Sequence, residues 1–94
     1  MADVHLPATL SPLFEGLPRQ LDVEAASVGE ALAQLDARWP GLRDRVCESA
    51  GAGEDGGTAL RPHIRVFVDG ERAELDTPLA PGARLDVIAA ISGG

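Results

Sequence analysis

Apolar and polar residues alternate in several stretches of the chain, and this period of two predicts strands. In residues 63–68 every second side chain is apolar, with Ile64 and Val66 on one face and Phe67 on the other. The pair Asp69-Gly70 follows and is typical of a tight turn, so a short return strand is expected. The predicted strands cover residues 4–6, 19–24, 63–68, 71–73 and 84–91.

A helical period lies between the second and third of these strands. Large apolar residues follow one another at spacings of four, three and four, which places them on one stripe of a helix: Val28, Leu32, Leu35 and Trp39. Ser27 and Glu30 have the spacing of an N-terminal capping box, in which each side chain bonds a backbone N–H near the other. The pair Pro40-Gly41 ends the helix, because proline cannot continue it, and residues 42–47 allow one further helical turn.

The order of the predicted elements favours an α+β fold. The first two strands form a hairpin with a long irregular connection, in which Leu10, Leu13 and Phe14 are expected to cover one end of the core. A helix between two hairpin-like halves should lie across one face of the sheet. The first and last strands have no hairpin partner in sequence, so we expect them to pair in parallel at the centre of the sheet. A mixed sheet with one main helix packed on one face is the β-grasp, or ubiquitin-like, architecture.

Composition narrows the possible functions. The 94 residues make one domain, and a net charge of −7 disfavours binding to nucleic acid or to an anionic membrane surface. An acidic surface suits a partner with a basic docking face, although plain solubility would explain it equally well. The sequence has one cysteine, no signal peptide pattern and no apolar run that could span a membrane. We therefore expect a cytoplasmic protein.

The most informative chemistry lies at the end of the sequence, which closes with Ile91-Ser92-Gly93-Gly94. Glycine does not help the preceding strand, because it has no side chain to pack and loses more backbone entropy on folding than other residues. Two glycines instead suit a thin tail that presents the carboxylate of Gly94. We therefore divide the chain into a folded domain, residues 1–90, and a tail, residues 91–94.

Other candidate sites are weaker. Cys47 has no histidine nearby in sequence to act as its base, and the cysteine and the two histidines lack the spacing of a metal site. Residues 51–57 are glycine-rich, but they lack the Gly-Lys-Ser/Thr ending of a phosphate-binding loop and carry two carboxylates, which would repel phosphate. We therefore expect no catalytic residue and no bound cofactor or metal, and hence a protein that is not itself an enzyme.

The sequence resembles the ubiquitin-like sulfur carriers of the MoaD/ThiS type over nearly its whole length. It is most similar in character to carriers of the actinobacterial MoaD/CysO kind. The segments that carry the resemblance are residues 4–7, 28–32, 35–42, 61–70, 79–82 and 91–94. No single segment is specific to the family, but their order, their spacing and the Gly-Gly ending are specific in combination. One departure is that those carriers commonly have Pro-Ala where this chain has Ala89-Ala90, and proline would stiffen the exit from the sheet.

The resemblance implies that the chain is a sulfur carrier. In that family a partner related to ubiquitin-activating enzymes, of the MoeB/ThiF type, uses ATP and Mg²⁺ to adenylate the C-terminal carboxylate, here that of Gly94. A sulfur donor then converts the acyl-adenylate into a thiocarboxylate, and the carrier gives the sulfur to a biosynthetic enzyme. The product stays open among molybdopterin, cysteine, thiamin and thiosugars. Ile91, Ser92 and Gly93 would thread the channel to the ATP, and the four tail residues span at most about 14 Å.

Docking to such enzymes needs a surface as well as a tail. In their strands, Phe67 and Ile88 alternate with the side chains that are expected to face the core, so we expect both on the exposed face of the sheet. Adjacent apolar side chains there would form a partner-docking patch, with His5 and Arg65 at its rim. The alternative is that a loop covers the two side chains.

Two other functions share the predicted fold. A ubiquitin-like protein modifier would join the same activated Gly94 to lysines of a target protein. All eight basic residues besides histidine are arginine, which argues against a modifier that builds polymers of itself through its own lysines. A non-covalent β-grasp binding module would not need the two glycines at all.

Overall fold

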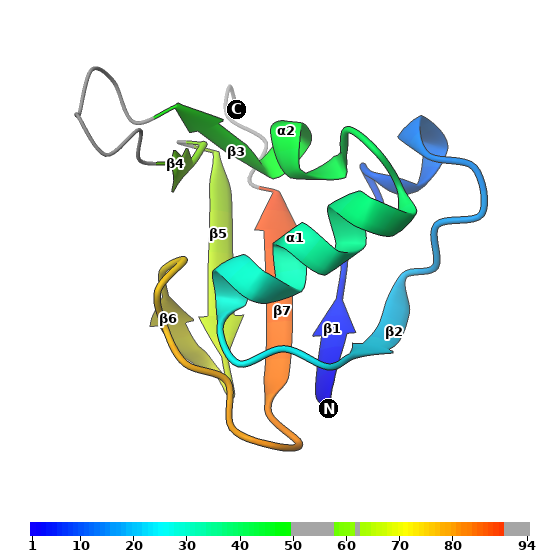
Figure 1. Cartoon of the computed structure of the whole chain (residues 1–94). Helices are drawn as coiled ribbons and strands as arrows, with labels where there is room; N and C mark the ends of the chain where they lie inside the picture. Colours follow the sequence, from blue (N-terminus) through cyan, green and yellow to red (C-terminus); the bar gives the residue numbers. More distant parts are fainter. Residues whose placement is uncertain (50–57, 62, 90–94) are drawn as a thin grey trace.

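The computed structural model describes residues 1–49, 58–61 and 63–89. A mixed sheet with strand order β2-β1-β7-β5-β6 is crossed on one face by the helix α1 (Figure 1). This confirms the predicted α+β architecture, a β-grasp. The strands of the sheet are β1 (Ala2–His5), β2 (Gln20–Val23), β5 (Ile64–Val68), β6 (Glu71–Ala73) and β7 (Arg84–Ala89).

The last strand, β7, lies at the centre of the sheet. It pairs in parallel with β1, where Val4 lies beside Leu85, and antiparallel with β5, where Val66 lies beside Val87. The predicted parallel pairing of the first and last strands is therefore confirmed. β7 ends at Ala89, and residues 90 and 91, which the sequence pattern added to this strand, lie outside the described residues.

The hairpin of β5 and β6 has the turn that its sequence predicts. Asp69 and Gly70 both have positive φ angles, +52° and +87°. A two-residue type I′ turn requires positive φ at both central positions, which aspartate and glycine accept more easily than most residues. The short return strand keeps Ala73 opposite Val66.

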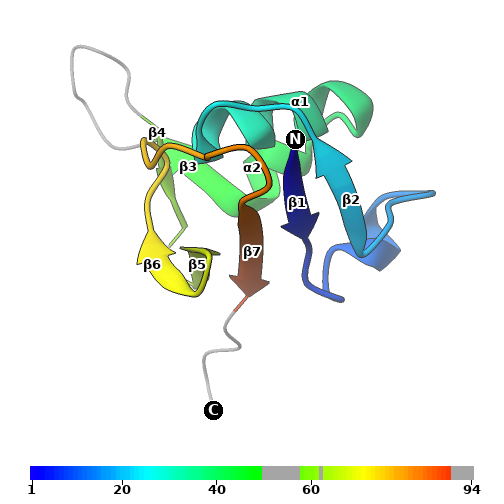
Figure 2. The same ribbon diagram turned by 90° about the horizontal axis from the view of Figure 1, so that it is seen from below.

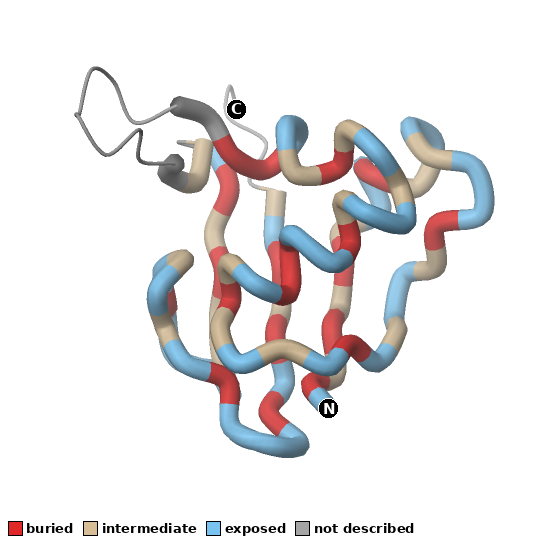
Figure 3. The backbone as a smooth tube through the Cα atoms, in the orientation of Figure 1, coloured by how far each residue is buried: buried red, intermediate tan, exposed pale blue. Residues whose placement is uncertain are grey.

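The helix α1 (Val28–Arg38) begins and packs as its sequence predicts. The Ser27 hydroxyl accepts a hydrogen bond from the Glu30 N–H (3.2 Å), and the Glu30 carboxylate reaches back to the Ala26 N–H (3.2 Å). In β1, β5 and β7, which the helix crosses, buried positions alternate with less buried ones (Figure 3). The helix residues buried against the sheet are Val28, Ala31, Leu32 and Leu35.

The connection from β6 to β7 holds the start of α1. The Val28 N–H donates to the Thr77 carbonyl (3.0 Å), and the Gly29 N–H donates to the Leu75 carbonyl (2.8 Å). These are N–H groups that a helix cannot satisfy within itself. A Cβ on Gly29 would lie 3.2 Å from the same Leu75 oxygen, so this close approach favours glycine.

A second, short helix and a small hairpin follow α1. The helix α2 (Leu42–Val46) begins after Gly41, whose φ is +95°, and one oxygen of Asp36 accepts from the N–H groups of Gly41 and Arg43 (3.1 Å each). The strands β3 (Cys47–Ser49) and β4 (Thr58–Leu60) then pair antiparallel. The sequence pattern had Cys47 in the helix and predicted neither strand, because three residues are too few to show a period of two.

The connection between β1 and β2 corrects one prediction. Leu10 is buried and Phe14 packs against the core, as expected, but Leu13 is 49% exposed. After the 3₁₀ turn η1 (Ser11–Leu13), the partly buried Phe14 packs against the core beside Gly41, while Leu13 lies on the outside of the turn. Neither helix in the described part of the chain is long and apolar enough to cross a membrane.

Substitutions at two residues of β7 should differ in their effect on the free energy of unfolding. Leu85 is fully buried, whereas Ile88 in the same strand is 45% exposed. We expect Leu85→Ala to lower the free energy of unfolding by about 2–5 kcal/mol, because it leaves a cavity in the core. Ile88→Ala should lower it by less than about 0.5 kcal/mol. Urea denaturation followed by circular dichroism measures both, and equal losses would mean that Ile88 belongs to the core.

Candidate functional site

The face of the sheet turned away from α1 carries the predicted docking residues. In β7 the side chains of Leu85 and Val87 are buried, so those of Asp86 and Ile88 point to the opposite face. On β5, Phe67 lies directly beside Asp86, and Arg65 lies directly beside Ile88. Phe67 and Ile88 are therefore diagonal neighbours, which is within reach of an aromatic side chain.

The two apolar side chains differ in exposure. Ile88 is among the most exposed large apolar residues of the described chain, while Phe67 is partly buried. We call this pair, Phe67 and Ile88, the apolar patch. Its neighbours across the strands are Asp86 and Arg65, and Arg72 on β6 lies beside Phe67. Charged groups thus border the patch on several sides.

His5 lies on the same face but one strand away. It pairs with Asp86 across β1 and β7, so β7 separates it from Phe67. Its ring nitrogen Nε2 donates to an oxygen of Asp3 (2.9 Å), and the other Asp3 oxygen accepts from the Gln20 amide (3.0 Å). On β7, Arg84 Nε lies 3.0 Å from an oxygen of Asp86. These five residues form a polar cluster beside the apolar patch.

Hydrogen bonds lower the pKa of Asp3. The bond from His5 contributes most and the bond from Gln20 contributes next, because both stabilise the ionised carboxylate. The lowered pKa therefore stabilises the folded state at pH values above the ordinary aspartate pKa. This stabilisation is lost as the pH falls through the pKa that Asp3 has in the folded protein. At neutral pH this side of the face presents a fixed negative charge.

Arg65 leans toward the edge of the sheet. Its Nη1 donates a long hydrogen bond to the Ile64 carbonyl (3.4 Å), while the Ile64 N–H donates to the Arg61 carbonyl (2.9 Å). Along an antiparallel strand, the backbone N–H and C=O groups of successive residues point to opposite sides. The Asp69 N–H bonds to Arg84 at the start of β7, so the backbone groups of Ile64, five residues earlier, point to the other side, toward β6. β6 is too short to pair with Ile64, and the two bonds satisfy these groups instead.

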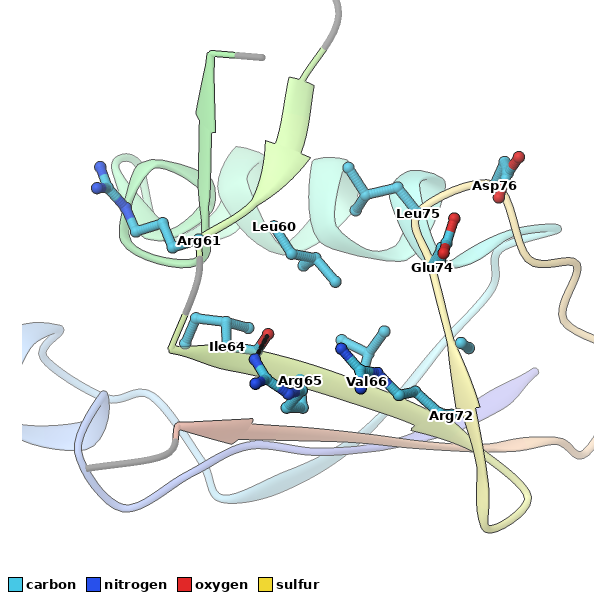
Figure 4. A pocket seen from close by; sticks show the side chains of 10 residues that line it. Leu60, Arg61, Ile64, Arg65, Val66, Arg72, Glu74, Leu75 and Asp76 are labelled. Carbon is cyan, nitrogen blue, oxygen red and sulfur yellow. Dashed lines mark hydrogen bonds between the residues drawn. The ribbon is translucent and has the colours of Figure 1, made fainter. Parts of the chain in front are cut away.

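A groove of about 710 Å³ opens along this edge (Figure 4). Its floor is apolar, with Ile64 and Val66, and Leu60 and Leu75 stand on its two sides. Arginines and carboxylates share the rim, so the groove has no single charge sign. Because the backbone of Ile64 is already bonded, the groove does not offer an open edge to an added strand.

Two further hollows meet at the end of β7, and both include Thr9 and Ala89. One, of about 440 Å³, lies beside the apolar patch and includes His5 and Ile88. The other, of about 900 Å³, lies on the side of α2. We call this second one the tail-base hollow, and its lining includes Leu13, Arg45, Arg61, His63, Ile64 and Ala89.

The tail-base hollow was not anticipated from the sequence. Arg45 comes from α2, whereas Arg61 and His63 come from the connection between β4 and β5. The signal available in the sequence was only that basic residues gather at 43–45 and 61–65. Nothing in their spacing shows that the two groups face one hollow, because the β3–β4 hairpin that joins them was not predicted.

The predicted tail itself lies outside the described residues. This applies to Gly94 and to Gly93, Ser92 and Ile91. The structure describes the strand that precedes them: β7 pairs with β1 from Arg84 to Asp86 and with β5 from Leu85 to its last residue, Ala89. Figure 2 shows the arrow of β7 pointing away from the turn that leads into the strand.

Cys47 is in a poor position for nucleophilic catalysis. Its side chain is buried, and this burial raises the pKa of the thiol. A raised pKa lowers the thiolate fraction, and the thiolate is the reactive form. Within the ranges 1–49, 58–61 and 63–89, no group of three or more metal-ligating side chains comes together.

Comparison with known protein families shows which family the chain belongs to. The family model of the ThiS family matches residues 4–94. The chain belongs to the ThiS family. The predicted resemblance to MoaD/ThiS-like carriers is thus confirmed, and the chain shares the fold of small sulfur carriers and ubiquitin-like modifiers. No curated protein matches the chain.

Solved structures agree with this ThiS-family fold. SAMP1 from Haloferax volcanii is 35% identical, with 99% of this chain and 98% of that chain covered and a TM-score of 0.68. CysO from Mycobacterium tuberculosis is 20% identical, with 97% and 100% covered and a TM-score of 0.79. CysO in the BexX/CysO complex from Amycolatopsis orientalis is 22% identical, with 100% of both chains covered and a TM-score of 0.78.

The polar cluster gives a prediction for carboxylate titration. In the variant His5→Ala, the pKa of Asp3 should rise toward the ordinary aspartate value, because the largest stabilising hydrogen bond is lost. Gln20→Ala should raise it by a smaller amount. Carbon-detected NMR of the Asp3 carboxyl group measures each titration. A pKa of Asp3 that stays unchanged in both variants would show that these bonds do not form in solution.

Proposed function

We propose that the chain is a sulfur carrier whose Gly94 carboxylate is activated by a separate enzyme and then carries sulfide. The observation that supports this most is the ThiS-family match, which extends through Gly93 and Gly94 to the end of the sequence. Since the activation uses ATP, we place the reaction in the cytoplasm.

The proposed chemistry has two steps. An activating enzyme of the MoeB/ThiF type uses MgATP, and a carboxylate oxygen of Gly94 attacks the α-phosphate and displaces pyrophosphate. A donor at the oxidation level of sulfide then attacks the acyl carbon and displaces AMP, leaving a thiocarboxylate. The carrier supplies neither acid nor base in these steps. It supplies an acyl group, which the adenylate makes reactive by providing a good leaving group.

The position of β7 suits this role. The strand is held by β1 from Arg84 to Asp86 and by β5 through Ala89, and the pairing with β5 gives its end a defined place on the molecule. The five residues from 90 to 94 can span at most about 18 Å. Glycine has no Cβ, so an enzyme can close around the backbone at Gly93 and Gly94.

We further propose that the apolar patch, Phe67 and Ile88, docks on the activating enzyme and on the sulfur-accepting biosynthetic enzyme. Ile88 is exposed and lies one residue before the end of β7, so a partner that takes the tail must come close to it. The charged neighbours of the patch, including Arg65 and the polar cluster with His5, would set the orientation of the partner.

A protein modifier is the second candidate function. The observation that favours it is the 35% identity with SAMP1, a small archaeal modifier protein. In this case a lysine amine of a target protein, rather than sulfide, would take the acyl group from Gly94. Both functions begin with the same adenylation, and they differ in the nucleophile that follows.

Removal of Gly94 tests the proposed site. The deletion should abolish thiocarboxylate formation while the thermal unfolding curve stays unchanged, because the residue lies beyond the last strand of the sheet. Mass spectrometry of the protein recovered from cells should show, for the intact chain, a gain equal to the mass difference between sulfur and oxygen.

The matched control for this deletion is Cys47→Ala, which removes the only thiol and should keep the mass gain. Full sulfur transfer by the Gly94 deletion would contradict the proposal. Higher-mass conjugates that require Gly94, without any thiocarboxylate, would instead establish the modifier function.

The apolar patch can be tested by one added charge. Ile88→Asp should weaken binding to the activating enzyme by about 1–2 kcal/mol, because a carboxylate would be desolvated in the interface. Ala33→Asp, at an exposed position of α1, is the matched control and should leave the affinity unchanged. Isothermal titration calorimetry measures both. Equal affinities of the two variants would place the interface elsewhere.

A further inference from the structure

The tail-base hollow stands out because its charge opposes that of the whole chain. The net charge is −7 with histidine counted as neutral, yet the described residues that line this hollow include two arginines, Arg45 and Arg61, together with His63, and one carboxylate, that of Asp44. Arg45 and His63 are both exposed. A local excess of positive charge on a protein of net negative charge favours an anionic ligand at that place.

The hollow is also held in a defined shape. The Arg61 side chain donates from Nε to the Asp44 carbonyl (2.9 Å), and the Arg61 N–H donates to the Val46 carbonyl (2.9 Å). These two bonds tie the connection after β4 to α2, so the basic groups from both segments keep their relative positions. Preorganised groups lose less entropy on binding than mobile ones.

An apolar wall completes the hollow on the side of η1. Leu13, which is half exposed, and the buried Leu10 line this wall, and Ile64 lies at the end of β5. Leu13 and Ile88 are among the most exposed large apolar side chains of the described residues, and each lies in one of the two hollows that meet at Ala89. The surface around the end of β7 is therefore apolar on two sides.

The length of the tail limits how far from this hollow a partner's active site can lie. Any active site that reaches Gly94 must lie within about 18 Å of Ala89, because five residues cannot span more. Ala89 itself is part of the hollow. The body of an enzyme that encloses the tail must therefore come close to the surface around Ala89, and the tail-base hollow is part of that surface.

We propose that the tail-base hollow receives a carboxylate-bearing segment of the activating enzyme, located at the mouth of the channel that takes the tail. This inference rests on the proposed function and adds a second contact on the α2 side of the tail, away from the apolar patch. Arg45 and His63 contact the acidic side chains, Arg61 supports the positive field, and Leu13 packs against the apolar part of the segment. Opposite charges at the mouth increase the rate of encounter and set the register of the tail.

The experiment is ATP–pyrophosphate exchange by the activating enzyme encoded in the same genome, with the full chain as substrate. We expect Arg45→Glu to raise the KM for the carrier about five- to tenfold at low salt, with kcat unchanged. The difference should shrink as sodium chloride is added, because salt screens exposed charges. His63→Glu should have the same direction of effect and serves if Arg45→Glu folds poorly.

The matched control is Arg38→Glu, the same charge change at an exposed position at the end of α1, outside the tail-base hollow. Its KM should equal that of the unmodified chain. If Arg45→Glu and His63→Glu also keep the KM, the inference is overturned while the proposed function stands. If the unmodified chain supports no exchange, both fail together.

A second copy of the chain is the competing occupant of the hollow. Light scattering distinguishes it, because self-association that is lost in Arg45→Glu would assign the hollow to a contact between copies and overturn the proposal. A chain that stays monomeric, with the change in KM for Arg45→Glu described above, supports the enzyme as the occupant.

Discussion

The pairing of β7 with both of its neighbours is the interaction on which the rest of the structure depends. β1 holds it in parallel and β5 holds it antiparallel, while Leu85 and Val87 enter the same buried cluster as Leu32 and Leu35 of α1. A strand bonded on both sides cannot leave the sheet without breaking two ladders. The core of the protein therefore fixes the point from which the last residues of the chain depart.

The period of two in β7 gives the strand two separate uses. Its inward side chains stabilise the domain by burial of apolar area, and its outward side chains, Asp86 and Ile88, belong to the exposed face. Changes on the outward face can alter recognition with little effect on folding, because they remove no core contact. This separation would suit the proposed docking of the apolar patch on more than one enzyme.

The sequence was sufficient for the main elements and insufficient for contacts between distant segments. Strand parity, the capping box of Ser27 and Glu30 and the Asp69-Gly70 turn are local signals, and the structure contains each of them. The β3–β4 hairpin is too short for a period to appear. The capping of α2 by Asp36 and the exposure of Leu13 depend on how elements pack, which no local pattern encodes.

In the candidate site, too, local sequence signals predicted some features, while features that depend on contacts between distant segments were missed. Parity alone placed Phe67 and Ile88 on one face, because the rule needs only the strand and its buried side. The tail-base hollow needs the three-dimensional arrangement of α2 with the connection after β4, which hydrogen bonds from Arg61 to the Asp44 and Val46 carbonyls hold together. An acidic protein with basic groups at one place can repel most acidic surfaces and still attract one there. Such a charge arrangement favours a partner that approaches along the tail over one that approaches the helix face.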